Sequence, residues 1–193
     1  MLTLLGRGCA ALFALAGTLM LASVAGLAAT RLALADVSLA LVAPLALGAQ
    51  AACVLALLGL RAAQPRPAGL ARAGLAAAWT AALVLVGGVA VLGVAGEAGA
   101  GLLPLVGYAY TLAASLAFAL YAGSVLLARG PSSALGLLLV TPALAWLPIL
   151  VVGATAGPAA ALPLDVYTNG PAALALLALA WCLRPSCRRH ADS

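Results

Sequence analysis

Long apolar runs alternate along the chain with short segments that hold the charged residues. A helix needs about 20 mostly apolar residues to cross a bilayer, and the first five runs reach that length. With a less regular sixth run, the pattern predicts spanning helices over residues 9–30, 39–60, 73–95, 102–128, 134–153 and 166–183, followed by a basic tail over residues 184–193. We therefore expect residues 1–193 to form a single all-α transmembrane domain.

The sixth run is interrupted at its start. Residues 155–171 contain three prolines and two glycines, which break helices. The uninterrupted part, residues 172–183, gives only about 18 Å of helix, against a hydrocarbon core of about 30 Å. Two alternatives follow: the linker lies partly in the membrane interface, or the helix begins near Val166 and tolerates Asn169, Gly170 and Pro171. We favour six spans with a short sixth.

The composition requires lipid as the main solvent of this chain. Hydrophobic residues make up 66% of it and charged residues only 7%, whereas soluble domains carry about 25% charged residues. The start of the chain, with Arg7 before an apolar run, is similar to a signal peptide. That run exceeds the roughly 7–15 residues of a signal core, so we expect it to be retained as a helix.

The arginines predict the orientation in the membrane. With a cytoplasmic N-terminus, only Arg31 of the nine arginines falls outside, together with Asp36, Glu97 and Asp165. Basic residues next to short loops concentrate on the cytoplasmic side, so we expect both termini in the cytoplasm and localisation in the plasma membrane. The net charge of +5 is spread over the ends of apolar runs and forms no face for nucleic acid. The expected partners are the lipid bilayer and a membrane protein or a second copy.

No catalytic, cofactor or metal residues are predicted. The carboxylates fall in predicted loops or the tail, and the single histidine, His190, lies in the tail. Cys182, Cys187 and His190 do not match the usual spacing of zinc ligands. We therefore expect a protein that is not an enzyme.

Two intramembrane features are candidates for a functional site. Gln50 is the most polar side chain at depth, and an unpaired amide in hydrocarbon costs several kcal/mol, so we expect an interhelical hydrogen bond or a ligand contact. Pro142 and Pro148 interrupt the fifth run on either side of Trp146. Broken helices at mid-membrane form binding sites in many transporters, although a static kink packed by its neighbours, the interpretation we favour, also explains the prolines. Thr80, Ser115 and Thr141 can bond their own helix backbone.

A stripe of small residues runs along the fourth predicted helix at every fourth position: Gly107, Thr111, Ser115, Ala119 and Gly123. Small residues at this spacing let two helices cross closely, so we interpret the stripe as a packing seam. Tyr108, Tyr110 and Tyr121 fall toward the ends of this helix, where aromatic rings anchor at the membrane interface. Asp165, Tyr167 and Asn169 cluster before the last apolar run, as an outer gate, a partner-binding loop or, the interpretation we favour, a turn.

Two functions remain open from the sequence. The first is a helix-packing binding, assembly or accessory component that acts through faces such as the stripe. The alternative is a small transporter or channel for an uncharged or hydrophobic solute, in which the segment from Pro142 to Pro148 moves and Gln50 contacts the solute.

Overall fold

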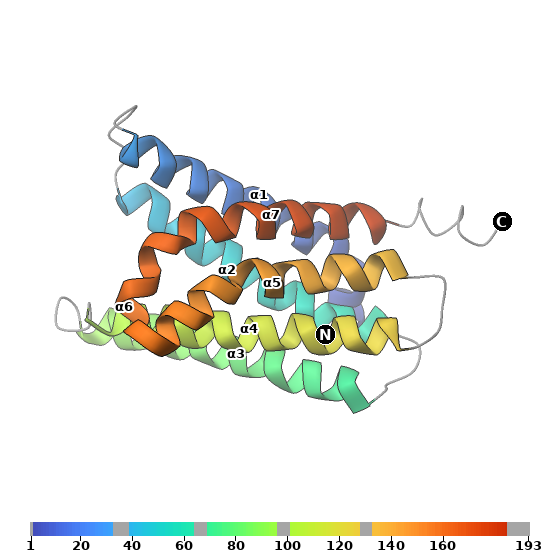
Figure 1. The fold of residues 1–193 in the computed structure, drawn as a ribbon. Helices are drawn as coiled ribbons and strands as arrows, with labels where there is room; N and C mark the ends of the chain where they lie inside the picture. Colours follow the sequence, from blue (N-terminus) through green and yellow to red (C-terminus); the bar gives the residue numbers. More distant parts are fainter. Residues whose placement is uncertain (1, 33–38, 64–68, 96–100, 128–132, 185–193) are drawn as a thin grey trace.

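The computed structural model describes residues 2–32, 39–63, 69–95, 101–127 and 133–184, and within them it is all-helical (Figure 1). The helices are α1 (Leu2–Arg31), α2 (Leu39–Ala63), α3 (Gly69–Ala95), α4 (Leu103–Leu126), α5 (Ser133–Ala156), α6 (Pro158–Ala161), the 3₁₀ helix η2 (Leu162–Leu164) and α7 (Asp165–Cys182). Six segments are long and apolar enough to cross a membrane, counting α6, η2 and α7 as one. The prediction of six such helices is therefore confirmed.

The long helices form two layers of three. In Figure 1, α7, α5 and α4 lie in front of α1, α2 and α3, and the short α6 lies at the left end of the bundle. Each helix packs against the next one in the chain, and α7 packs back against α1, so the six helices close into a ring. The two central helices, α2 and α5, make little direct contact with each other within the described residues. Side chains therefore fill the space between the layers.

The last span is helical from Pro158 onward, in the three pieces α6, η2 and α7. Gly157 takes a left-handed φ of 93° after α5, a conformation that glycine adopts without strain, and α6 begins directly at Pro158. The helix α7 then starts at Asp165 and includes Asn169, Gly170 and Pro171. The alternative in which the helix begins near Val166 and tolerates Asn169, Gly170 and Pro171 therefore describes this segment. The helix starts one residue earlier, at Asp165.

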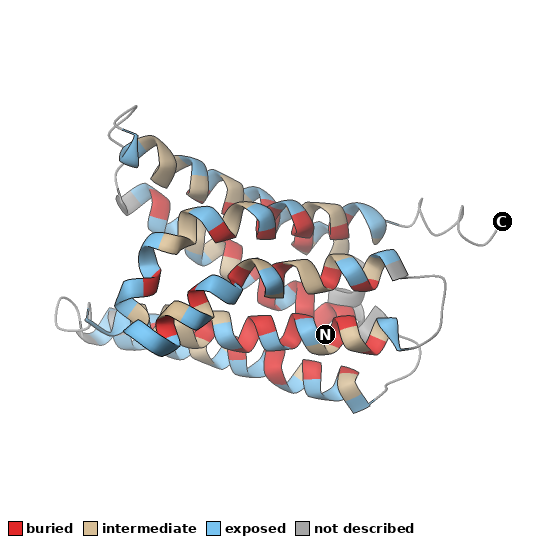
Figure 2. Ribbon diagram, viewed as in Figure 1, coloured by how far each residue is buried: buried red, intermediate tan, exposed pale blue. Residues whose placement is uncertain are grey.

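Apolar side chains cover both the inside and the outside of the bundle. Buried residues face the space between the layers, whereas exposed residues follow the outer faces (Figure 2). On α3, for example, Leu83, Val86 and Val94 are all exposed. An apolar outer surface of this extent is unfavourable in water and favourable in lipid, which agrees with the low charge content.

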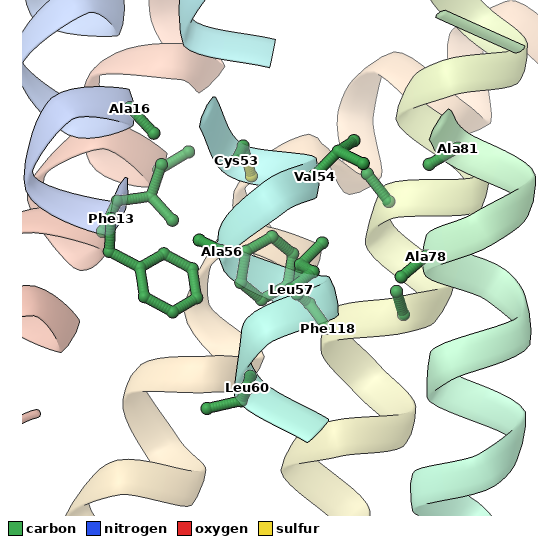
Figure 3. Close-up of a cluster of buried hydrophobic side chains, with 14 of the residues drawn as sticks. Phe13, Ala16, Cys53, Val54, Ala56, Leu57, Leu60, Ala78, Ala81 and Phe118 are labelled. Atoms are coloured by element: carbon green, nitrogen blue, oxygen red, sulfur yellow. The ribbon is translucent and has the colours of Figure 1, made fainter. Parts of the chain in front are cut away.

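A cluster of buried side chains fills the middle of the bundle (Figure 3). Phe13 of α1 and Phe118 of α4 lie in it with ring centroids 6.3 Å apart. Phe118 also meets Trp146 of α5 edge-on, at 6.0 Å between centroids. These three rings form a row from one layer to the other, which we call the aromatic row. Ring pairs at such distances are favourable arrangements.

Candidate functional site

A partly open cavity of about 80 Å³ lies at the end of the bundle where α6 is found. All the long helices except α3 contribute to its walls, together with α6 and η2. The residues that line it are Met20, Ser23, Ala46, Ala49, Gln50, Pro104, Gly107, Tyr108, Tyr110, Thr111, Trp146, Ile149, Pro158, Ala161, Leu162, Asp165 and Asn169. A buried water needs about 10–15 Å³ of such space, so the cavity has room for a few waters or one small solute.

Gln50 of α2 lines this cavity. Its backbone carbonyl accepts a hydrogen bond from the hydroxyl of Tyr110 at 3.1 Å, which ties α2 to α4. Its side-chain amide has no hydrogen-bond partner within the described part of the chain. The interhelical bond expected for the Gln50 amide is thus not formed there, and the amide is left to interact with the contents of the cavity.

Trp146 of α5 reaches the same cavity and is only 3% exposed. Its indole Nε1–H donates to Oδ1 of Asn169 on α7 at 2.8 Å. This bond uses the indole donor and one acceptor of the amide, whereas the two N–H donors of an asparagine remain available beside it. Asn169 therefore belongs to a cavity wall, and the turn that we favoured for this segment is wrong because α7 continues through it.

Asp165 lies one helical turn before Asn169, so the two side chains share a face of α7, and both line the cavity. Tyr167 lies between them on the outer surface and is 72% exposed. The guanidinium of Arg31, at the end of α1, donates from Nη1 to the carbonyl oxygen of Pro163 at 3.0 Å and attracts the Asp165 carboxylate. Arg31 thereby links α1 to the segment that leads into α7.

Two hydroxyl groups complete the polar lining. Thr111 donates to the carbonyl of Gly107 in its own helix at 2.9 Å, which leaves its oxygen free to accept. Ser23 of α1 is only 7% exposed and makes no hydrogen bond to any described residue. The Ser23 oxygen is not among the fully buried atoms that lack a partner, so it is open to the cavity, where water or a ligand can bond to it.

Two tyrosines of α4, Tyr110 and Tyr121, are buried inside the bundle and are not interface anchors, contrary to the expectation from their positions. Tyr110 is 3% exposed and Tyr121 is fully buried. The hydroxyl of Tyr108 donates to the carbonyl of Leu150 on α5 at 3.2 Å, and its ring lies where a Cβ on Gly153 would be. Because Gly153 has no side chain, the ring of Tyr108 fits against α5 and forms part of the cavity wall.

The small-residue stripe of α4 is divided among different surroundings. Gly107 and Thr111 line the cavity. Ser115 is buried, and its hydroxyl has no partner within the described residues. Ala119 is exposed on the outer surface, and a Cβ on Gly123 would meet Leu70 of α3 at 3.5 Å. The two prolines of α5 lie outside the cavity, Pro142 buried and Pro148 exposed, and α5 is a continuous helix through both.

The cavity borders the aromatic row, because Trp146 belongs to both. The sequence predicted Gln50 and Trp146 as site residues, and the structure brings them to one cavity. Ser23 and the role of Asp165 were missed. The signal for Asp165 was its spacing of four from Asn169, which places both on one face if the segment is helical.

Within the described residues, no group of three or more histidine, cysteine, aspartate or glutamate side chains could hold a metal ion. The tail residues Cys187 and His190 lie outside the described residues. No family model, no curated protein and no solved structure matches this chain.

Proposed function

We propose that this chain is a multi-pass plasma-membrane protein that binds a small polar solute in the cavity and carries it across the bilayer. The observation that carries the proposal is the polar lining itself. Gln50 and Ser23 present groups to the cavity that no described residue satisfies. Unsatisfied polar groups in an apolar bundle cost free energy unless the cavity contents pair with them.

The arrangement supports a carrier rather than an open channel. Under the orientation that the arginines favour, the cavity end faces outward, because it contains the end of α1 and the start of α2. The aromatic row then separates the cavity from the cytoplasmic half. A site that is reached from one side and blocked toward the other is what alternating access requires of one of its states. The proposed role involves no chemical conversion.

Flux into proteoliposomes tests this proposal. The purified chain is reconstituted and exposed to a panel of labelled small solutes, including neutral amides and alcohols, amines and carboxylates. We expect saturable uptake of at least one solute, and we expect Gln50→Leu to reduce it about tenfold or more, because a polar contact to the solute is lost.

Thr80→Val is the matched control for this experiment. Thr80 is exposed on α3, away from the cavity, and its hydroxyl returns to the carbonyl of Ala76, so its loss should leave uptake unchanged. Absence of saturable uptake across the whole panel, with correctly folded protein in the vesicles, would refute the carrier. Equal losses in Gln50→Leu and Thr80→Val would refute the role of the cavity.

An assembly role is a second candidate, supported by one observation on α4. Ala119 is a small residue on the outer surface, three residues after the exposed Leu116 and seven after the exposed Leu112, and small surface residues allow a second helix to approach closely. If this face binds a second copy or another membrane protein, Ala119→Trp should abolish cross-linked complexes in native membranes. Unchanged cross-linking would rule this face out.

A further inference from the structure

The described lining of the cavity carries one formal charge, and that charge is negative. Asp165 is the only charged residue among the described residues that line it. Arg31, whose guanidinium attracts this carboxylate, is exposed and does not line the cavity, and its Nη1 is directed at the carbonyl of Pro163. An exposed guanidinium is screened by solvent and ions, so it balances the carboxylate only in part.

The neutral polar groups of the lining add hydrogen-bond acceptors to this charge. The hydroxyl oxygens of Thr111 and Tyr108 keep free lone pairs because both groups donate elsewhere. The buried hydroxyl of Ser23 has no described partner and can accept as well. The amides of Gln50 and Asn169 add N–H donors to the lining, and the carboxylate together with these oxygens matches the N–H donors of a positively charged solute.

The rest of the wall is apolar and the space is small. Met20, Ile149 and Leu162 line the cavity without polar hydrogens, and a volume of about 80 Å³ holds only a few heavy atoms beyond the charged group. Hard metal cations prefer six or more oxygen ligands. The described residues contain no group of three or more histidine, cysteine, aspartate or glutamate side chains that could hold such an ion. The combination therefore favours an ammonium group that carries a short alkyl chain over an inorganic cation.

We propose that the cavity binds small primary alkylammonium ions, with Asp165 as the charge-recognising residue and Ser23 and Thr111 as neutral acceptors. This inference rests on the proposed carrier function and specifies its solute class. In this arrangement the alkyl group contacts the apolar wall, and the ammonium N–H groups donate to the carboxylate of Asp165.

Equilibrium binding of labelled methylammonium to the full chain in lipid nanodiscs tests the inference. We expect saturable binding, competition by ethylammonium, and no competition by tetrabutylammonium, which exceeds the cavity. Acetamide, which is small but uncharged, should compete at least about tenfold more weakly, and Asp165→Asn should weaken binding about 10- to 100-fold, because a hydrogen bond to a charged group is lost.

Tyr167→Phe is the matched control on the same helix. Its side chain is exposed and does not line the cavity, so methylammonium binding should stay within about twofold of the original chain, as for surface changes of small effect. If Asp165→Asn does not fold, the comparison of methylammonium with acetamide on the unchanged protein still decides whether charge is recognised. Asp165→Glu, which keeps the charge, should restore part of the binding.

The other outcomes separate this inference from the function on which it rests. If acetamide or another neutral solute binds better than methylammonium, and Gln50→Leu removes that binding, the ammonium assignment is wrong and the carrier stands. If sodium or potassium displaces methylammonium at equal concentration, the assignment to alkylammonium ions is also wrong. If no solute of any class binds, both proposals fail.

Discussion

The contact of α1 with the backbone of α7 at Gly17 allows a prediction of how a substitution there changes stability. A Cβ added to Gly17 of α1 would lie 2.8 Å from Cγ of Leu177 and 2.9 Å from the backbone oxygen of Ala173, both on α7. Ordinary contacts begin at 3.4 Å, so the Cβ is about 0.5 Å too close to a carbonyl that cannot rotate away. The leucine side chain can move, but the Ala173 carbonyl moves only with α7.

Two opposing terms set the expected stability of Gly17→Ala. Replacement of glycine by alanine inside a helix contributes about 0.8–1 kcal/mol of favourable propensity. Overpacking of a tight contact costs about 1–3 kcal/mol. We therefore expect Gly17→Ala to be about 1 kcal/mol less stable to unfolding than the original chain.

Gly8→Ala in the same helix is the matched control. A Cβ at Gly8 meets nothing within 4 Å, so only the propensity term acts, and we expect a gain of up to about 1 kcal/mol. Both variants are measured by thermal unfolding in mild detergent. Exposed Cys182 is labelled at the outset, and unfolding is then followed by labelling of the buried thiols of Cys9 and Cys53. If both alanines stabilise the protein equally, the α1–α7 contact at Gly17 is not as close as described.

Three further changes probe the cavity and the aromatic row. Gly107→Leu fills open space in the lining, so it should reduce solute binding at least about tenfold while thermal unfolding stays nearly unchanged. Phe118→Ala removes the ring between Phe13 and Trp146; we expect about 3–5 kcal/mol lower stability and non-saturable solute leakage into proteoliposomes. Trp146→Phe removes the indole donor to Asn169, and unfolding measurements should show a loss of about 1 kcal/mol that is not additive with Asn169→Leu.

Local hydrogen bonding was largely predictable because it involves neighbours in the chain. Thr80 and Thr141 return their hydroxyls to the carbonyls of Ala76 and Leu137, four residues earlier, as expected. Ser115 was expected to do the same, but its hydroxyl has no partner within the described residues. A serine can bond its own helix, yet the rotamer that does so competes with the packing around the side chain.

The hydrophobic pattern of the sequence did not show which side of each helix faces the interior of the bundle. The helices α4 and α5 are apolar around nearly their whole circumference, so no polar face shows which side is turned outward. The expectation that the tyrosines of α4 anchor at the interface failed for Tyr110 and Tyr121 for this reason. Their depth along the helix was inferred from sequence, but their direction depended on the carbonyl of Leu150, the carbonyl of Gln50 and the space at Gly153.

The sequence by itself determined the number of apolar helices and their approximate limits, because the length of an apolar run is compared with a fixed bilayer thickness. It also singled out Gln50 and Trp146, since polar and aromatic groups at depth stand out against alanine and leucine. Only the tertiary structure decided that these two residues share a cavity with Ser23, Asp165 and Asn169. Contacts between helices depend on rotation about each axis, and in an apolar bundle that rotation is set by the close packing of side chains against one another.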